Sequence, residues 1–344
     1  NSIMFPTDVV KVLVTGGCGF IGSNFILTLF HRTGQHSCAD LSNFHLENLG
    51  EDFQLMNLDA MTYAANPDNL APIEKLENYH FVKVDISDKK QVENAAGGFK
   101  PDFIVHFAAE SHVDRSIESG DIFVKTNVLG TQVMLDFANR HNVKKFVHIS
   151  TDEVYGSISE GSFNESDMLY TSNPYSASKG GSDLLAISHF ETYGTPVTIT
   201  RCTNNFGPGQ HKEKLIPKII HLVKKKKRIP IYGDGSNVRD WIYVKDHCTA
   251  ITKVLESGVA GEIYNIAGRN EISNIEVVES VFATMGIDNK SSESGVGYDL
   301  TSDRPGHDWR YSIDDSKLRS LGWKSIMSFQ EGLEHTVNWY GGYE

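Results

Sequence analysis

The chain has 344 residues, 40% of them hydrophobic and 22% charged, an ordinary globular composition and a length for one large domain or two fused ones. Its formal net charge of −12 argues against an extended nucleic-acid-binding surface. No segment approaches the roughly 18 apolar residues of a membrane span, and no signal-peptide pattern opens the sequence, so we expect a cytoplasmic protein without a membrane partner.

The cysteines give no sign of a metal site. Cys18, Cys38, Cys202 and Cys248 are far apart, with no C-x-x-C pair and no histidine at zinc-ligand spacing. We therefore expect reduced thiols and no metal. The one dense basic run, 224–228, follows the apolar run 215–223 and is interpreted as the solvated end of a helix.

The first predicted strand, residues 11–15, runs directly into a glycine motif. In "GGCGFIGS", Gly16, Gly19 and Gly22 are spaced G-x-x-G-x-x-G, and an apolar helix follows. Such a turn lets the backbone approach a pyrophosphate closely, and the helix N-terminus supplies N–H groups and a positive dipole end. Strand, glycines and helix in this order predict a dinucleotide site.

Further strands are predicted at 53–58, 81–84, 103–107 and 146–149, with helical stretches between them. This alternation predicts an α/β fold with a doubly wound parallel Rossmann sheet. "STDEVYG", residues 150–156, then lies at the carboxyl end of a strand, where such sheets bind their ligands.

Two carboxylates compete for the adenosine ribose. Asp40 has the usual spacing of about 20 residues from the glycines, but its surroundings are too polar for a buried strand. Asp59 ends a better strand, and choosing it makes residues 31–52 an insertion. A carboxylate at this position repels a 2′-phosphate, so NAD is favoured over NADP.

"NPYSASKGGSD" places Tyr175 and Lys179 four residues apart on a predicted helix opened by Asn173 and Pro174. The ammonium is expected to favour the phenolate and lower the pKa of Tyr175. Tyr79 and Lys83 have the same spacing, but on a strand, and are interpreted as structural.

The chain at this point resembles the extended short-chain dehydrogenase/reductases, and among them the nucleotide-sugar 4,6-dehydratases. The resemblance covers nearly the whole chain. It rests on "TGGCGFIGS", "LDAMTYAAN", "HFAAESHVDRSI", "STDEVYG", "PYSASKGGSD", "NNFGPGQ", "EKLIP", "PIYGDG", "RDWIYVKDH", "IYNIAG" and "DRPGHDWRY".

The resemblance implies NAD-dependent dehydration of dTDP-glucose to dTDP-4-keto-6-deoxyglucose, as in deoxysugar biosynthesis of the rhamnose type. It assigns removal of the 4-hydroxyl proton to Tyr175, helped by Lys179 and Thr151, while hydride leaves C4. Glu153 then removes the C5 proton, Asp152 protonates the departing 6-hydroxyl, and hydride returns to C6. Two adjacent acids in a dry cleft suit these roles, because like charge keeps one of them neutral.

The same resemblance assigns two sets of contacts. The NAD site would comprise Gly16, Gly19, Phe20, Ile21, Gly22, Asp59, Thr62, Asp85, Ile86, Ala108, Ala109, Ser111, Asn127, Tyr175, Lys179 and Asn205. The nucleotide sugar would be held by Ser111, Thr151, Asn204, Lys214, Leu215, Pro230, Tyr232, Arg239, Asn274, Arg304 and His307. Purely structural roles stay open for three of these residues: Asn274 as a helix cap, His307 as a surface residue and Asp85 as a strand end.

We predict an NAD-binding domain at residues 8–194, carrying the catalytic residues, and a smaller nucleotide-sugar-binding region at 195–344 whose strands partly interleave with the core sheet. Helices near 121–141 and 175–193 could pair in a homodimer, as relatives commonly do.

Three alternatives stay open. The same reaction on UDP-glucose is excluded by few residues. A C4 epimerase or decarboxylase of this fold is disfavoured by Asp152 and Glu153. An NAD-sensing scaffold without catalysis is disfavoured because Tyr175, Lys179 and the Thr-Asp-Glu triplet are all present.

Overall fold

The computed structural model describes residues 9–32, 53–287 and 296–341. Seven parallel strands form its central sheet, in the order β10-β6-β5-β4-β1-β2-β3. They are β1 (Val10–Thr15), β2 (Phe53–Asp59), β3 (Tyr79–Lys83), β4 (Phe103–His106), β5 (Lys145–Thr151), β6 (Val197–Cys202) and β10 (Ile263–Ile266). The predicted doubly wound parallel sheet is confirmed, and the strand order reverses between β1 and β4.

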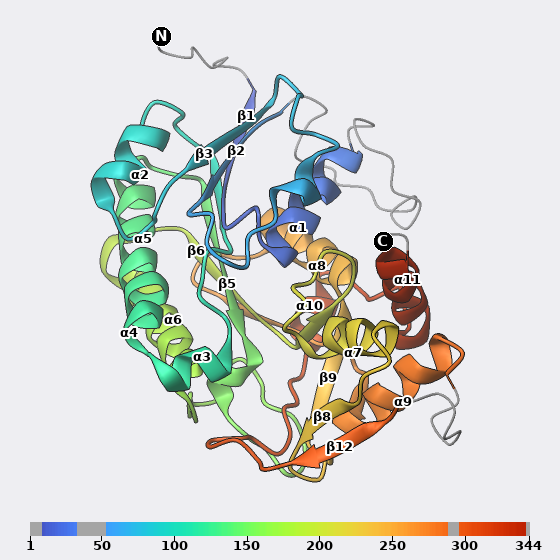
Figure 1. The fold of residues 1–344 in the computed structure, drawn as a ribbon. Coiled ribbons are helices and arrows are strands. Elements are labelled where there is room, and N and C mark those ends of the chain that lie inside the picture. Colours follow the sequence, from blue (N-terminus) through green and yellow to red (C-terminus); the bar gives the residue numbers. More distant parts are fainter. Residues whose placement is uncertain (1–8, 33–52, 288–295, 342–344) are drawn as a thin grey trace.

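Helices cover both faces of this sheet (Figure 1). On one face lie α1 (Phe20–Arg32) and α8 (Val244–Ser257); on the other lie α2 (Lys89–Ala96), α5 (Thr131–Arg140) and α6 (Pro174–Tyr193). The central strands are apolar on both sides because both sides are covered: Val12, Leu13 and Val14 are all 0% exposed.

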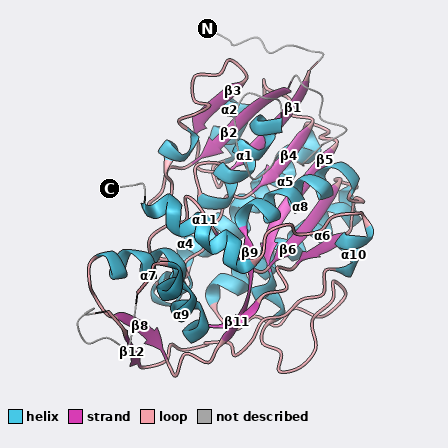
Figure 2. Ribbon diagram, turned by 90° about the vertical axis from the view of Figure 1, so that its right-hand side faces the viewer, coloured by secondary structure: helices cyan, strands magenta, loops and turns pink. Residues whose placement is uncertain are grey.

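A smaller group of elements packs below the carboxyl ends of the sheet (Figure 2). It contains the three-stranded sheet β11-β9-β7 and the parallel pair β12-β8, around an apolar cluster that includes Phe206, Trp241 and Phe282. Its elements are β7 (Asn204–Phe206), α7 (Leu215–Lys224), β8 (Ile229–Tyr232), β9 (Val238–Tyr243), β11 (Glu271–Ser273), α9 (Asn274–Thr284), β12 (Tyr298–Thr301) and α11 (Phe329–Gly341). Since β6 and β10 belong to the central sheet, the C-terminal half does interleave with it; a domain boundary at residue 194 stays a prediction.

The predicted helix at 121–141 consists of three parts: α4 (Asp121–Phe123), a π-helical stretch η3 (Val124–Gly130) and α5. At the junction, a Cβ on Gly130 would lie 2.6 Å from Cδ1 of Ile86. The remaining short elements are η2 (Pro67–Leu70), α3 (Val113–Glu118), η4 (Asp152–Tyr155) and α10 (Ser316–Ser320). In the described part of the chain, no helix combines the length and apolarity needed to cross a membrane.

Candidate active site

The glycine turn after β1 is closed by backbone contacts that leave no room for side chains. Gly16 has φ of +73°, and a Cβ there would lie 2.6 Å from the backbone nitrogen of Ala108. At Gly22, the second residue after Phe20 in α1, a Cβ would lie 2.3 Å from the carbonyl oxygen of Gly16. The turn therefore exposes backbone at a helix N-terminus, which is the arrangement that a dinucleotide pyrophosphate requires.

Asp59 ends β2 beside this turn and is 7% exposed. Its Oδ2 accepts a hydrogen bond from the amide of Cys18 at 2.9 Å, and its Oδ1 accepts one from Met61 at 2.8 Å. Burial raises the pKa of the carboxyl, while these two bonds oppose the rise. These bonds hold the Asp59 side chain beside the glycine turn, where a carboxylate that binds the adenosine ribose is expected. The competing Asp40 and most of the 31–52 insertion lie outside the described residues.

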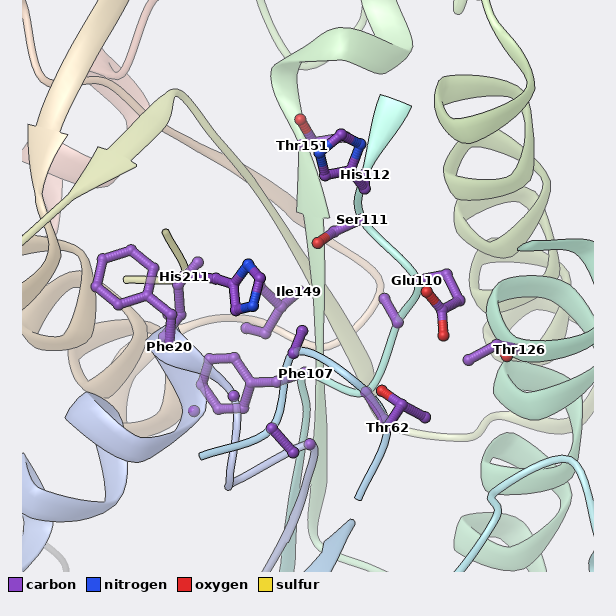
Figure 3. A pocket seen from close by; sticks show the side chains of 18 of the residues that line it. Phe20, Thr62, Phe107, Glu110, Ser111, His112, Thr126, Ile149, Thr151 and His211 are labelled. Atoms are coloured by element: carbon purple, nitrogen blue, oxygen red, sulfur yellow. The ribbon is translucent and has the colours of Figure 1, made fainter. Parts of the chain in front are cut away.

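One cleft of about 360 Å³ extends from the glycine turn to the carboxyl end of β5 (Figure 3). Most of the predicted NAD residues line it: Gly16, Gly19, Phe20, Ile21, Gly22, Asp59, Thr62, Asp85, Ile86, Ala108, Ala109, Ser111, Tyr175, Lys179 and Asn205. The predicted ligand Asn127 instead lies behind the wall and is 1% exposed. Its Nδ2 donates to the Glu110 carbonyl at 2.9 Å and to Ser178 Oγ at 2.8 Å, so it supports the loop after β4.

The five predicted catalytic residues meet at the far end of the same cleft. Thr151 ends β5, and Asp152 and Glu153 begin the 3₁₀ turn η4. Tyr175 and Lys179 lie on α6, which opens as predicted with Asn173 and Pro174: Asn173 is the N-cap, and its side chain accepts a hydrogen bond from the Ser176 amide at 2.9 Å. The two sequence motifs, one at the end of β5 and one on α6, are brought together by the packing of α6 on β5.

The two adjacent carboxyls differ in their surroundings. Burial raises the pKa of Asp152 well above its usual range, and the charges of Glu153 and Asp240 raise it further. The pKa of Glu153 is also raised by burial and by the charge of Asp308, but less far, because the cations Arg239, Arg304 and Lys214 oppose the rise. We infer that the proton resides on Asp152, leaving Glu153 as the ionised partner.

Both carboxyls also keep a free acceptor. Asp152 Oδ2 and Glu153 Oε2 are buried and have no hydrogen-bond partner among the described residues. The other oxygen of Asp152 accepts a hydrogen bond from Thr151 Oγ1 at 3.3 Å. Buried polar atoms are normally paired, so these two oxygens are suited to a polar ligand in the cleft.

The expectation that Lys179 lowers the pKa of the Tyr175 phenol is wrong for this structure. Burial raises that pKa well above 10.0, and the charge of the ionised Glu153 adds to the effect. The Lys179 ammonium points to β5 instead, with Nζ donating to the Ile149 carbonyl at 2.6 Å. Burial lowers the pKa of Lys179 to about 8, against the opposing charge of Asp183.

The predicted sugar-nucleotide residues fall into two groups. Ser111, Thr151, Asn204 and Lys214 line the cleft, and Lys214 Nζ donates to the Ser111 carbonyl at 2.9 Å. Leu215, Pro230, Tyr232, Arg239, Asn274, Arg304 and His307 come from the smaller group of elements and are not part of the cleft wall.

Within the second group, Tyr232 and Arg304 meet at one carboxylate. The Tyr232 hydroxyl donates to Asp114 Oδ2, and Arg304 Nη1 donates to Asp114 Oδ1, both at 3.3 Å. The ring of His307 lies edge-on to that of Tyr232, with centroids 6.4 Å apart, and its Nδ1 is 2.6 Å from Asp303 Oδ1. These side chains form a polar group that faces α3 from β8 and the 301–307 segment.

Leu215 begins α7, and Pro230 lies on β8. Asn274 begins α9 and its amide donates to the Asn237 carbonyl at 3.1 Å, but Ser273 is the residue whose side chain caps that helix. The alternative of Asn274 as the helix cap is therefore wrong. Asp85 lies beyond the end of β3 and bonds to Ser87 and to Lys125, so it does more than end the strand.

Several side chains of the cleft were not predicted. Among the residues that line it are Tyr63, Glu110, His112, His211 and Glu213. Arg115 links two of these segments: its guanidinium lies 3.7 Å from the Tyr63 ring centroid and donates to Glu213 Oε1 at 2.8 Å. Glu110 and His112 follow a strand end, a signal that could have found them; the loop 210–214 carries no such signal.

A buried ion pair supports the catalytic helix from behind. Asp183, on the same helix face as Tyr175 and Lys179, accepts a hydrogen bond from Arg201 Nε at 2.9 Å, and Arg201 Nη1 donates to the Tyr155 hydroxyl at 2.8 Å. Both charged residues are at most 2% exposed. A buried charge needs such a partner, and the pairing joins α6 to β6.

This fold, with its glycine turn, strand-end Thr151 and helical Tyr175 and Lys179, defines a dinucleotide-binding enzyme of the extended short-chain dehydrogenase/reductase type. The chain belongs to the GDP-mannose 4,6-dehydratase family, whose model matches residues 13–336.

Relatives of known name are similar to this chain over nearly the whole of their own length. A dTDP-glucose 4,6-dehydratase of Streptomyces niveus is 46% identical over 96% of this chain and 93% of its own. The low-salt glycan biosynthesis protein Agl12 of Haloferax volcanii is 48% identical over 97% of this chain and 99% of its own. Among solved structures, the dTDP-glucose 4,6-dehydratase DesIV of Streptomyces venezuelae, crystallised with NAD, superposes with a TM-score of 0.86 at 45% identity, covering 96% of this chain and 97% of that one.

Proposed function

We propose that this chain is a hydro-lyase that dehydrates dTDP-glucose to dTDP-4-keto-6-deoxyglucose with NAD as its cofactor. The observation that carries the proposal is the Asp152–Glu153 pair, two adjacent buried carboxyls in a cleft that also contains Tyr175, of which Asp152 has its pKa raised further than Glu153. An acid and a base side by side are what elimination of water requires. The names of the relatives in two bacterial species support the same activity and substrate.

The residues present fit NAD, because the glycine turn offers bare backbone and Asp59 is fixed beside it. When bound, NAD would supply hydride transfer, from C4 of the sugar and back to C6. Gly16, Gly19, Gly22 and Asp59 would hold the adenosine end, and Lys179 the nicotinamide ribose.

The chain's own groups would handle the protons. Tyr175, once ionised to the phenolate, would take the proton of the 4-hydroxyl, with Thr151 hydrogen-bonded to the same oxygen. Burial raises the pKa of this phenol, and the positive charge that NAD would supply when bound would oppose that rise. Glu153 then removes the C5 proton that the 4-ketone has acidified, and Asp152 gives its proton to the leaving 6-hydroxyl.

Substrate labelled with deuterium at C4 tests the whole proposal. We expect a 4-keto-6-deoxy product with deuterium at C6, without net release of reduced cofactor. Steady release of reduced cofactor, or loss of the label from the sugar, would contradict it in favour of a simple dehydrogenase. Running dTDP-glucose and UDP-glucose side by side decides the base preference, and inversion at C4 without loss of water would identify an epimerase instead.

Three finer expectations stay predictions of the sequence: a homodimer paired through helices near 121–141 and 175–193, a cytoplasmic location, and a place in rhamnose-type biosynthesis. Sedimentation of the purified chain tests the first of them.

A further inference from the structure

The segment 304–311 is fastened to the start of the catalytic helix through one side chain, Asp308. Its Oδ2 accepts hydrogen bonds from two hydroxyls, that of Ser172 and that of Tyr311, the latter at 2.6 Å. Its backbone carbonyl accepts two more, from Arg239 Nη2 at 2.9 Å and from Asn237 Nδ2 at 3.2 Å. One residue thus joins three separate parts of the chain.

The contact with Ser172 lies directly at the catalytic helix. Ser172 precedes Asn173, the N-cap of α6, and Tyr175 is the second residue of that helix. Gly306 brings the segment close: it has φ of +64°, and a Cβ there would lie 2.8 Å from the Ser172 carbonyl oxygen. The backbone on both sides of this contact is therefore fixed in position.

On its other side, the 304–311 segment holds the guanidinium of Arg239 in place. Arg239 is 5% exposed, and its Nη1 donates to the carbonyls of Val238 at 2.7 Å and Trp309 at 3.3 Å. Its guanidinium carbon lies 4.3 Å from the centroid of the Tyr311 ring, whose hydroxyl donates to Asp308. Among the charges that lower the pKa of Glu153, that of Arg239 has the largest effect, whereas the charge of Asp308 raises that pKa.

We propose that Asp308 is a positioning residue, which anchors the 304–311 segment to the start of α6 and so fixes Arg239 relative to the Asp152–Glu153 pair. This inference rests on the proposed function, since the pair is the machinery that Asp308 would serve. The anchor needs an oxygen that accepts hydrogen bonds from two hydroxyls. An asparagine keeps such an oxygen, whereas an alanine leaves both hydroxyls without an acceptor.

The experiment compares Asp308→Ala with Asp308→Asn in the full chain loaded with NAD. We expect kcat for dTDP-glucose to fall on the order of 10²-fold in the alanine variant, the scale of a misplacement of about 1 Å, and to be largely restored in the asparagine variant. Bound NAD should be unchanged in both, because the glycine turn lies at the opposite end of the cleft. Asp314→Asn is the matched control: Asp314 also accepts from a serine, Ser316, but on the exposed surface.

A double-mutant cycle tests the route of the effect. If Asp308 acts through the two hydroxyls, Asp308→Ala should add little to the loss already caused by Ser172→Ala with Tyr311→Phe. Full additivity, or an asparagine variant as impaired as the alanine variant, would overturn the anchor.

Hydrogen exchange of the 304–311 peptide gives a readout that does not depend on turnover. We expect faster exchange in Asp308→Ala than in Asp308→Asn. Faster exchange with kcat equal to that of the control would reduce Asp308 to a structural residue and overturn the inference. Absence of product with the wild-type chain would overturn the proposed function instead. Equal exchange in Asp308→Ala and Asp308→Asn would overturn the anchoring role of Asp308, whatever the activity.

Discussion

Asp152→Asn replaces a buried acid with an amide of nearly the same shape. The wild-type side chain is 2% exposed and accepts a hydrogen bond from Thr151 Oγ1, which the amide oxygen can retain. The amide cannot give a proton to a leaving hydroxyl. We therefore expect elimination to slow by roughly 10²–10⁴-fold, the usual loss for a general acid, while C4 oxidation suffers less because Tyr175 performs it.

The same change should stabilise the fold at neutral pH. Burial, together with the charges of Glu153 and Asp240, raises the pKa of Asp152 in the folded state above its unfolded value. The folded state therefore binds more protons than the unfolded state between the two pKa values, so its stability falls as pH rises through that interval. Each pKa unit is worth about 1.4 kcal/mol, and each kcal/mol shifts Tm by about 2 °C in a chain of this size. Because asparagine does not titrate, the Asp152→Asn variant should not lose this folding stability as pH rises.

Two measurements check these expectations. Thermal unfolding should show a Tm for Asp152→Asn that exceeds the wild-type value at pH 8, with the difference vanishing near pH 4, close to the unfolded pKa of about 3.9. Stopped-flow absorbance of the reduced nicotinamide should show that C4 oxidation survives. The reasoning is refuted if the variant loses C4 oxidation as completely as Tyr175→Phe, or if its Tm difference is the same at both pH values.

Four further changes probe the rest of the site. Glu153→Gln should slow elimination by roughly 10²–10⁴-fold. It should also remove the fall in rate that the wild type shows as pH drops through the raised pKa of Glu153. A pH–rate profile checks this, and an unchanged acidic limb would exclude Glu153 as the base. Tyr175→Phe should abolish C4 oxidation with NAD still bound, checked in a single turnover, and ready oxidation would point to another base. Asp59→Ala should weaken NAD binding, measured by calorimetry, whereas Asp40→Ala should not; equal effects would overturn the choice of Asp59. Gly22→Ala should lose NAD because its Cβ would lie 2.3 Å from the Gly16 carbonyl oxygen, and an undiminished thermal shift on NAD addition would contradict the steric argument.

The sequence by itself determined the features that depend on neighbours along the chain. β1 and β5 were predicted within two residues of their bounds because a strand buried on both faces is a continuous apolar run. The glycine turn was predictable because only glycine fits its backbone, and Tyr175 and Lys179 because a spacing of four residues places side chains on one helix face. With strand ends converging on one edge of the sheet, these signals also located the cleft.

The tertiary structure alone decided how the site's groups ionise and what holds them. Tyr175 was expected to have a lowered pKa from its spacing to Lys179, yet burial and the Glu153 carboxylate raise it. Arg239 lowers the pKa of both Asp152 and Glu153, whereas Arg304 and Lys214, which are distant in sequence, are cations that lower that of Glu153. Desolvation and charge act through space, and no local spacing encodes which remote cations reach a buried carboxyl. For the same reason the motif "DRPGHDWRY", which contains Asp308, gave no sign of the anchoring role proposed for this residue, since Ser172 reaches it from 136 positions away along the chain.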